Sequence, residues 1–138
     1  MALKVELKPG ERVIIGDSVV TNGEHRARLL IDGDAPILRE KDILTVAEAD
    51  TPCKRIYLVV QLMYLTGNPA RQHDLYFELV NDVVKAAPST TRYVEVISRL
   101  ISEGALYKAL KETRALIVYE SELLARGRVL AAGPASAA

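Results

Sequence analysis

Arg39 carries the side chain best suited to ligand binding in this chain. It ends a predicted strand and opens the charged run 39–42, Arg-Glu-Lys-Asp. A planar guanidinium at a sheet edge can donate paired hydrogen bonds to a phosphate or to the edge of a guanine. The structural alternative is a surface ion pair with Glu40 or Asp42, and the residue types alone leave both interpretations open.

A second group of cations lies on the last predicted helix. Lys108, Lys111 and Arg114 recur every three residues, which places them close together on a helical surface. This secondary basic patch could contact phosphates. Glu112 follows Lys108 by four residues, a spacing typical of a helix-stabilising pair, so a solvated and internally paired face is the competing interpretation.

Residues that serve catalysis or metal binding form no recognisable motif. His25 and His73 are far apart in the sequence, and neither has a second potential ligand at the spacing of a metal site. Cys53 is expected to be a packed apolar residue. The glycines are isolated, so no phosphate-cradling loop is predicted. We expect a binding protein without enzymatic activity, cofactor or metal.

The composition predicts one compact, cytoplasmic protein. The chain has 138 residues, of which 49% are hydrophobic, and its 18 Lys and Arg balance 18 Asp and Glu. Zero net charge argues against indiscriminate coating of nucleic acid, so any RNA must bind at a local patch. No apolar run approaches the roughly 20 residues of a membrane span, and no signal peptide pattern is present. No membrane partner is expected.

The pattern of residues 1–46 predicts a small antiparallel β lobe of about five strands. Apolar and charged residues alternate over 3–7, and short β runs follow at 13–15, 19–21 and 26–31. Pro36 restricts the last strand, 36–39, to a sheet edge or to its own first position. Asn22-Gly23 predicts a tight hairpin between the third and fourth strands.

The second group, residues 51–127, predicts a bundle of about four helices, which makes the fold class α+β. Thr51 and Pro52 form a helix start, and Gly67 forms a stop. Further helices are expected from about 69 to 87, 89 to 103 and 105 to 126, with Gly127 closing the last. Residues 128–138, rich in Ala, Gly and Ser, predict a disordered tail.

All the aromatic residues belong to the helical part: Tyr57, Tyr64, Tyr76, Phe77, Tyr93, Tyr107 and Tyr119. The β lobe lacks large core side chains and is too small to fold alone. We therefore expect its edges near Val5 and Ile37 to be covered by the helices or by a second copy in a homodimer. Without aromatic residues on the sheet, RNA contact there would depend on Arg, Lys and backbone groups.

Four segments resemble the FlbT family of flagellin post-transcriptional regulators over nearly the whole chain. They are residues 8–12, Lys-Pro-Gly-Glu-Arg; 34–43, Asp-Ala-Pro-Ile-Leu-Arg-Glu-Lys-Asp-Ile; 54–64; and 106–111. The resemblance implies a post-transcriptional repressor of flagellum biogenesis. Such a protein would bind the 5′ untranslated region of flagellin mRNA and promote its degradation, and would have a small partner called FlaF.

Residues 1–45 also resemble the carbon-storage-regulator (CsrA) family of RNA binders. In that family two chains interleave, and an Arg ending the last strand of one chain meets RNA together with the first strand of the other. The resemblance implies that Arg39 is this Arg and that Lys4, Val5, Leu7 and Lys8 belong to the partnering strand. Two features differ from that family: the first strand is less basic here, and the hairpin at 22–23 is shorter.

A second function remains open alongside RNA binding. The chain could be a flagellar chaperone or adaptor whose helices bind FlaF or flagellin, with indirect effects on mRNA. That function would need an apolar groove among Tyr57, Tyr64 and Tyr76, whereas direct RNA binding needs the edge that carries Arg39.

Overall fold

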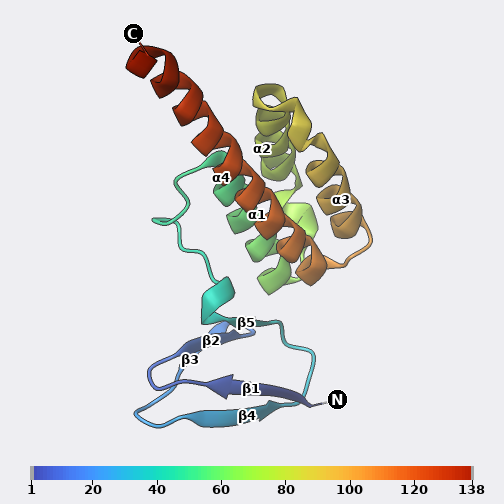
Figure 1. Ribbon diagram of the computed structural model, residues 1–138. Helices are drawn as coiled ribbons and strands as arrows, with labels where there is room; N and C mark the ends of the chain where they lie inside the picture. Colours follow the sequence, from blue (N-terminus) through green and yellow to red (C-terminus); the bar gives the residue numbers. More distant parts are fainter. Residues whose placement is uncertain (1, 138) are drawn as a thin grey trace.

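The computed structural model describes residues 2–137, and side-chain surroundings are described as far as residue 127. Strands come first and helices follow, which confirms the predicted α+β class (Figure 1). The strands are β1 Leu3–Leu7, β2 Arg12–Ile15, β3 Ser18–Thr21, β4 Ala27–Ile31 and β5 Ile37–Arg39. The helices are α1 Pro52–Thr66, α2 His73–Ala86, α3 Thr91–Ser102 and α4 Leu106–Ala137, with 3-10 turns η1 Glu40–Asp42, η2 Pro69–Gln72 and η3 Pro88–Thr90.

The strands form two small antiparallel sheets. β1 pairs with β4, while β2 pairs with both β3 and β5. A two-residue turn at 16–17 joins β2 to β3, and Gly16 has a φ of 64° there. A type II′ hairpin requires a positive φ at its first central position, which glycine adopts without strain.

The predicted hairpin at Asn22-Gly23 is wrong, because β3 and β4 belong to different sheets. The Asn22 amide instead donates hydrogen bonds to the backbone carbonyls of Leu7, Lys8 and His25, at 3.2, 2.8 and 2.8 Å. Three carbonyl acceptors hold this residue in a crossover between the sheets. The intrinsic preference of Asn-Gly for a tight turn is therefore outweighed by bonds that the sequence pattern does not show.

The core of the β lobe is small and aliphatic. Val5, Leu7 and Val13 are fully buried, which confirms the alternation predicted over residues 3–7 at Val5 and Leu7 but not at the exposed Leu3. Partly buried residues surround them: Ile15, Val20, Leu29, Ile31 and Ile37. Leu38, next along β5, belongs instead to the core of the helices. The sheet thus packs on the helical part, as its size requires.

The helical part is built around α1, which packs against both α2 and α4. Thr51 caps α1 as predicted, because its hydroxyl accepts a hydrogen bond from the Lys54 amide at 3.3 Å. Gly67 ends the helix with a φ of 67°. Four apolar residues at helical spacing on α1 are all buried: Ile56, Val59, Val60 and Met63.

The last helix differs from its predicted form. α4 continues past Gly127 to Ala137, through the segment predicted as a disordered tail. A glycine in a helix costs only about 1 kcal/mol relative to alanine, so Gly127 alone does not end the helix. Leu124 is exposed near the end of the predicted helix, whereas Leu116 is fully buried. Figure 1 shows the reason: α4 extends beyond the other helices, so its later turns have fewer neighbours.

The edge of β5 is covered by α1. The Tyr64 hydroxyl accepts a hydrogen bond from the Ile37 amide at 3.1 Å and donates one to the Ile37 carbonyl at 2.9 Å. One side chain thus satisfies both backbone groups that an edge strand leaves free. The expectation that the helices cover the edge near Ile37 is confirmed.

Candidate nucleic-acid interface

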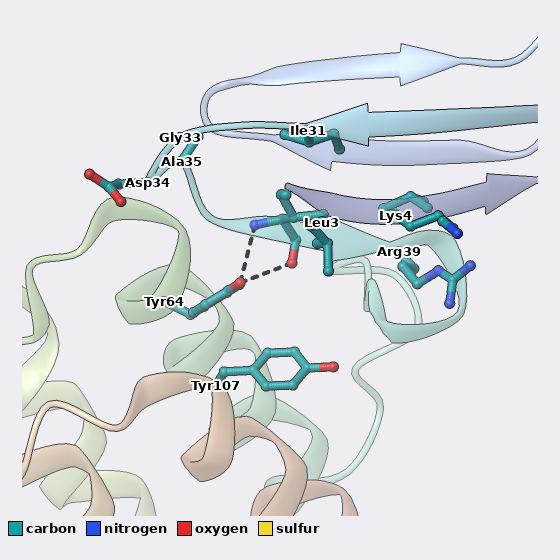
Figure 2. A pocket seen from close by; sticks show the side chains of 11 residues that line it. Leu3, Lys4, Ile31, Gly33, Asp34, Ala35, Arg39, Tyr64 and Tyr107 are labelled. Atoms are coloured by element: carbon teal, nitrogen blue, oxygen red, sulfur yellow. Dashed lines mark hydrogen bonds between the residues drawn. The ribbon is translucent and has the colours of Figure 1, made fainter. Parts of the chain in front are cut away.

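A cleft of about 470 Å³ lies where the β lobe meets the helices. Lys4 and Arg39 supply its cationic groups, Leu3 and Ile37 line its β side, and Tyr64 and Tyr107 line its helical side. Figure 2 shows Lys4 and Arg39 extending to the same side of the strands, with Tyr107 across the cleft on the helical wall. The site therefore combines two cations and one carboxylate, that of Asp34, with aromatic surface.

Arg39 is held at this cleft by β1. Its Nη2 atom donates a hydrogen bond to the Glu6 carbonyl at 3.0 Å. The surface ion pairs considered for Arg39 do not form in the described residues, because Glu40 pairs with Arg12 at 3.0 Å and Asp42 pairs with cations of α4. A guanidinium has five N–H donors, so most of its donors remain available to a ligand.

The first-strand residues divide into two kinds. Lys4 and Lys8 are exposed, but only Lys4 lines the cleft, since Lys8 lies in the turn after β1, where its amide bonds to Glu11. The side chains of Val5 and Leu7 are buried in the core of the β lobe. Val5 and Leu7 can therefore meet a ligand only through backbone atoms.

The contact between Arg39 and the first strand forms within one chain. The CsrA resemblance implied that the last strand of one chain would lie beside the first strand of another. Here β1 pairs with β4 and β5 pairs with β2 of the same chain, and the Arg39 side chain bridges from β5 to β1. No second copy is needed to bring these residues together.

The secondary basic patch is largely occupied by a structural role. Arg114 and Lys111 approach the Asp42 carboxylate at 3.5 and 3.7 Å. The Asp42 side chain is only 7% exposed, whereas the two cations are about half exposed, at 47% and 46%. Arg114 also donates to the Lys41 carbonyl at 3.2 Å and to the Tyr57 hydroxyl at 3.1 Å. These bonds tie η1 to α4 and α1.

Lys108 and Lys111 therefore differ in what they offer a ligand. Lys108 is exposed, and among the described residues it makes no ion pair. The Lys111 Nζ lies 5.2 Å from the centre of the Tyr107 ring. The interaction with Tyr107, aided by the charge of Asp42, raises the pKa of Lys111 above its ordinary value.

Cys53 is a packed residue, as expected. Its side chain is fully buried, and burial together with the Glu120 carboxylate raises the pKa of the thiol. Glu120 accepts hydrogen bonds from the Thr51 hydroxyl and, at 3.0 Å, from the Cys53 amide. The thiol is therefore not an activated nucleophile.

Within residues 2–137, no group of three or more His, Cys, Asp and Glu side chains is arranged to hold a metal ion. None of the helices in that range combines the length and apolar character that a membrane span requires.

Sequence reasoning missed the aromatic wall of the cleft. Tyr64 and Tyr107 lie in different helices, and their rings meet at a centroid distance of 5.6 Å beside Arg39. Only the tertiary arrangement places them opposite the β lobe. The groove that an adaptor would need among Tyr57, Tyr64 and Tyr76 does not form, because Tyr57 and Tyr76 are buried in the core.

The fold and the cleft together define a small α+β protein that presents cationic and aromatic groups where its two parts meet. The chain belongs to the FlbT family: the family model "Flagellar protein FlbT" matches residues 3–124. No solved structure is significantly similar to it.

Several relatives match over nearly their full length. A protein of Bradyrhizobium diazoefficiens named "Probable flagellum biosynthesis repressor protein FlbT 1" is 56% identical over 135 residues, covering 97% of this chain and 91% of the relative. A Rhodopseudomonas palustris protein with the corresponding name is 55% identical, covering 91% of this chain and all of the relative. The "Flagellum biosynthesis repressor protein FlbT" of Caulobacter vibrioides is 35% identical, covering 90% of each.

Proposed function

We propose that this chain is a cytoplasmic, non-enzymatic repressor of flagellum biogenesis that acts after transcription. It binds the 5′ untranslated region of flagellin mRNA at the cleft between the β lobe and the helices, and this binding promotes degradation of the message. The repressor role is supported by the names of its relatives. Binding of RNA is supported by the chemistry of the cleft.

The position of Arg39 is the observation that carries the proposal. Its guanidinium lies in a cleft with Lys4, is anchored by one bond to a backbone carbonyl, and makes no ion pair among the described residues. An anchored guanidinium with free donors suits a phosphate or a base edge. Backbone atoms of β1 lie beside it, so the site can also offer main-chain groups.

Two measurements test this function. The purified protein is titrated with a labelled flagellin leader RNA and with a scrambled RNA of equal composition, and we expect tighter binding of the leader. In cells, a reporter mRNA carrying the leader should decay faster when the protein is expressed. Equal weak binding of both RNAs, with an unchanged reporter half-life, would contradict the proposal.

A second candidate function is an adaptor that binds FlaF or flagellin, with indirect effects on mRNA. It is favoured by an apolar groove of about 330 Å³ between α1 and α2, where Leu62 and Leu75 are exposed beside Leu58 and Leu79. Grooves of this kind bind amphipathic helices. The test combines Leu62→Ser with Leu75→Ser. If this double variant no longer captures purified FlaF while its RNA affinity is unchanged, FlaF binds at the groove and not at the cleft.

A further inference from the structure

Tyr107 is an exposed aromatic residue placed at the cleft by the start of α4. Its side chain is 42% exposed, although it lies against Tyr64 with an interplanar angle of 50°. Tyr64 is itself fixed by its two hydrogen bonds to the Ile37 backbone. The Tyr107 ring therefore rests on a rigid support, the Lys111 Nζ lies 5.2 Å from its centre, and the rest of its surface faces solvent.

The surroundings of this ring suit one nucleotide. The cleft volume of about 470 Å³ falls within the range of small-molecule sites. Tyr107 lines one wall, and Lys4 and Arg39 lie on the opposite side. Aromatic side chains stack on unpaired bases of any type, while neighbouring cations bind the backbone phosphates. A paired base inside a duplex could not present its face to the ring.

We propose that the cleft holds one unpaired nucleobase, stacked on the Tyr107 ring, with the adjoining phosphate bound by Lys4 and Arg39. This inference rests on the proposed binding of mRNA at the same cleft, and it names the form of RNA that the cleft accepts. It also makes the helical part a direct contributor to the RNA site. A duplex of the same sequence binds more weakly than the single strand.

The test uses the absence of tryptophan from this chain. Tyr107→Trp introduces a single indole whose emission reports stacking. Titration with a short, unstructured RNA taken from a flagellin leader should quench this emission, with a midpoint equal to that of binding measured on the labelled RNA. Tyr107→Phe keeps the ring and should stay within about twofold of the wild-type affinity, whereas Tyr107→Ala should weaken binding by about 5- to 150-fold.

Tyr119→Ala is the matched control, because it removes the same ring three turns further along α4, where Tyr119 stacks on Tyr93. Thermal melts of each variant verify folding. A folded Tyr107→Ala protein with wild-type affinity, or an unquenched Tyr107→Trp protein that binds RNA, would overturn the stacking inference and leave the RNA function standing. A wild-type protein that binds neither the leader nor the short RNA would overturn both.

Discussion

Arg39 differs from two other arginines of the β lobe in what its guanidinium contacts. Arg12 and Arg28 each make an exposed ion pair, with Glu40 at 3.0 Å and Glu6 at 3.1 Å. Arg39 bonds instead to a backbone carbonyl, which orients the group without compensating its charge. An oriented and uncompensated cation is better suited to an anionic ligand than a paired one.

Replacing Arg39 by Ala should separate binding from stability. The variant loses one exposed hydrogen bond, so its free energy of unfolding should fall by no more than about 1 kcal/mol. RNA binding should weaken by about 1–3 kcal/mol, whether the guanidinium bonds to a base edge or to the phosphate of the stacked nucleotide. Denaturant melts and a labelled-RNA titration measure the two quantities.

The matched control for Arg39 is Arg99→Ala. Arg99 lies on α3, and its side chain is exposed and paired with Glu103 at 3.8 Å. Its removal deletes the same charge away from the cleft and should leave affinity unchanged. If both variants weaken binding equally, the effect comes from net charge, and Arg39 is not a specific contact.

At the scale of elements, the pairing of η1 with α4 is electrostatically asymmetric. Asp42 is almost completely buried, while Lys111 and Arg114 are about half exposed. Loss of the cations leaves a buried carboxylate unpaired, whereas loss of the carboxylate leaves cations that water can solvate. The two deletions should therefore have unequal costs.

We expect Lys111→Gln with Arg114→Gln to lower the free energy of unfolding by about 2–4 kcal/mol, and Asp42→Asn to lower it by only about 1 kcal/mol. Urea denaturation at neutral pH measures both values. Equal costs, or a larger cost for Asp42→Asn, would show that the carboxylate is not held in a low-dielectric site.

Within the secondary basic patch of α4, Lys108 is the cation that makes no ion pair among the described residues. Lys108→Gln should reduce the magnitude of the slope of log affinity against log salt by about 0.7, the value for one phosphate contact on a single strand. Its control is Lys85→Gln on the exposed surface of α2, which should leave the slope unchanged. An unchanged slope for Lys108→Gln would show that this helix face contacts solvent and not RNA.

Elements with strong local signals were predictable from the sequence, and the cleft was not. The strand over 3–7 and the capped helix from Pro52 to Gly67 follow from periodicity and end signals. The pairing of β1 with β4 depends on the three carbonyls bound by Asn22, and no local pattern encodes such partners. Arg39 could be identified as a strand-end cation, but Tyr107 becomes a site residue only because α4 begins opposite that strand.

At the scale of the whole molecule, β3 presents an unpaired edge. Within the described residues it pairs only with β2, and it carries the exposed Val19, outside the residues that line the cleft. Unpaired edges promote association between chains. We therefore propose a homodimer, and light scattering should give about twice the monomer mass of 15.1 kDa. A monomer at all concentrations would contradict this prediction.

The charge balance of the molecule limits how RNA can bind. With 18 cationic and 18 acidic side chains, the chain can neutralise only the few phosphates that reach the cleft, roughly two to four. Log affinity should fall with log salt at a slope of about −1.5 to −3, far shallower than for a strongly basic protein. Preference for the leader over a scrambled RNA should therefore persist at physiological salt. A titration across a salt series measures the slope, and a value steeper than about −5 would show that many phosphates are bound outside the cleft.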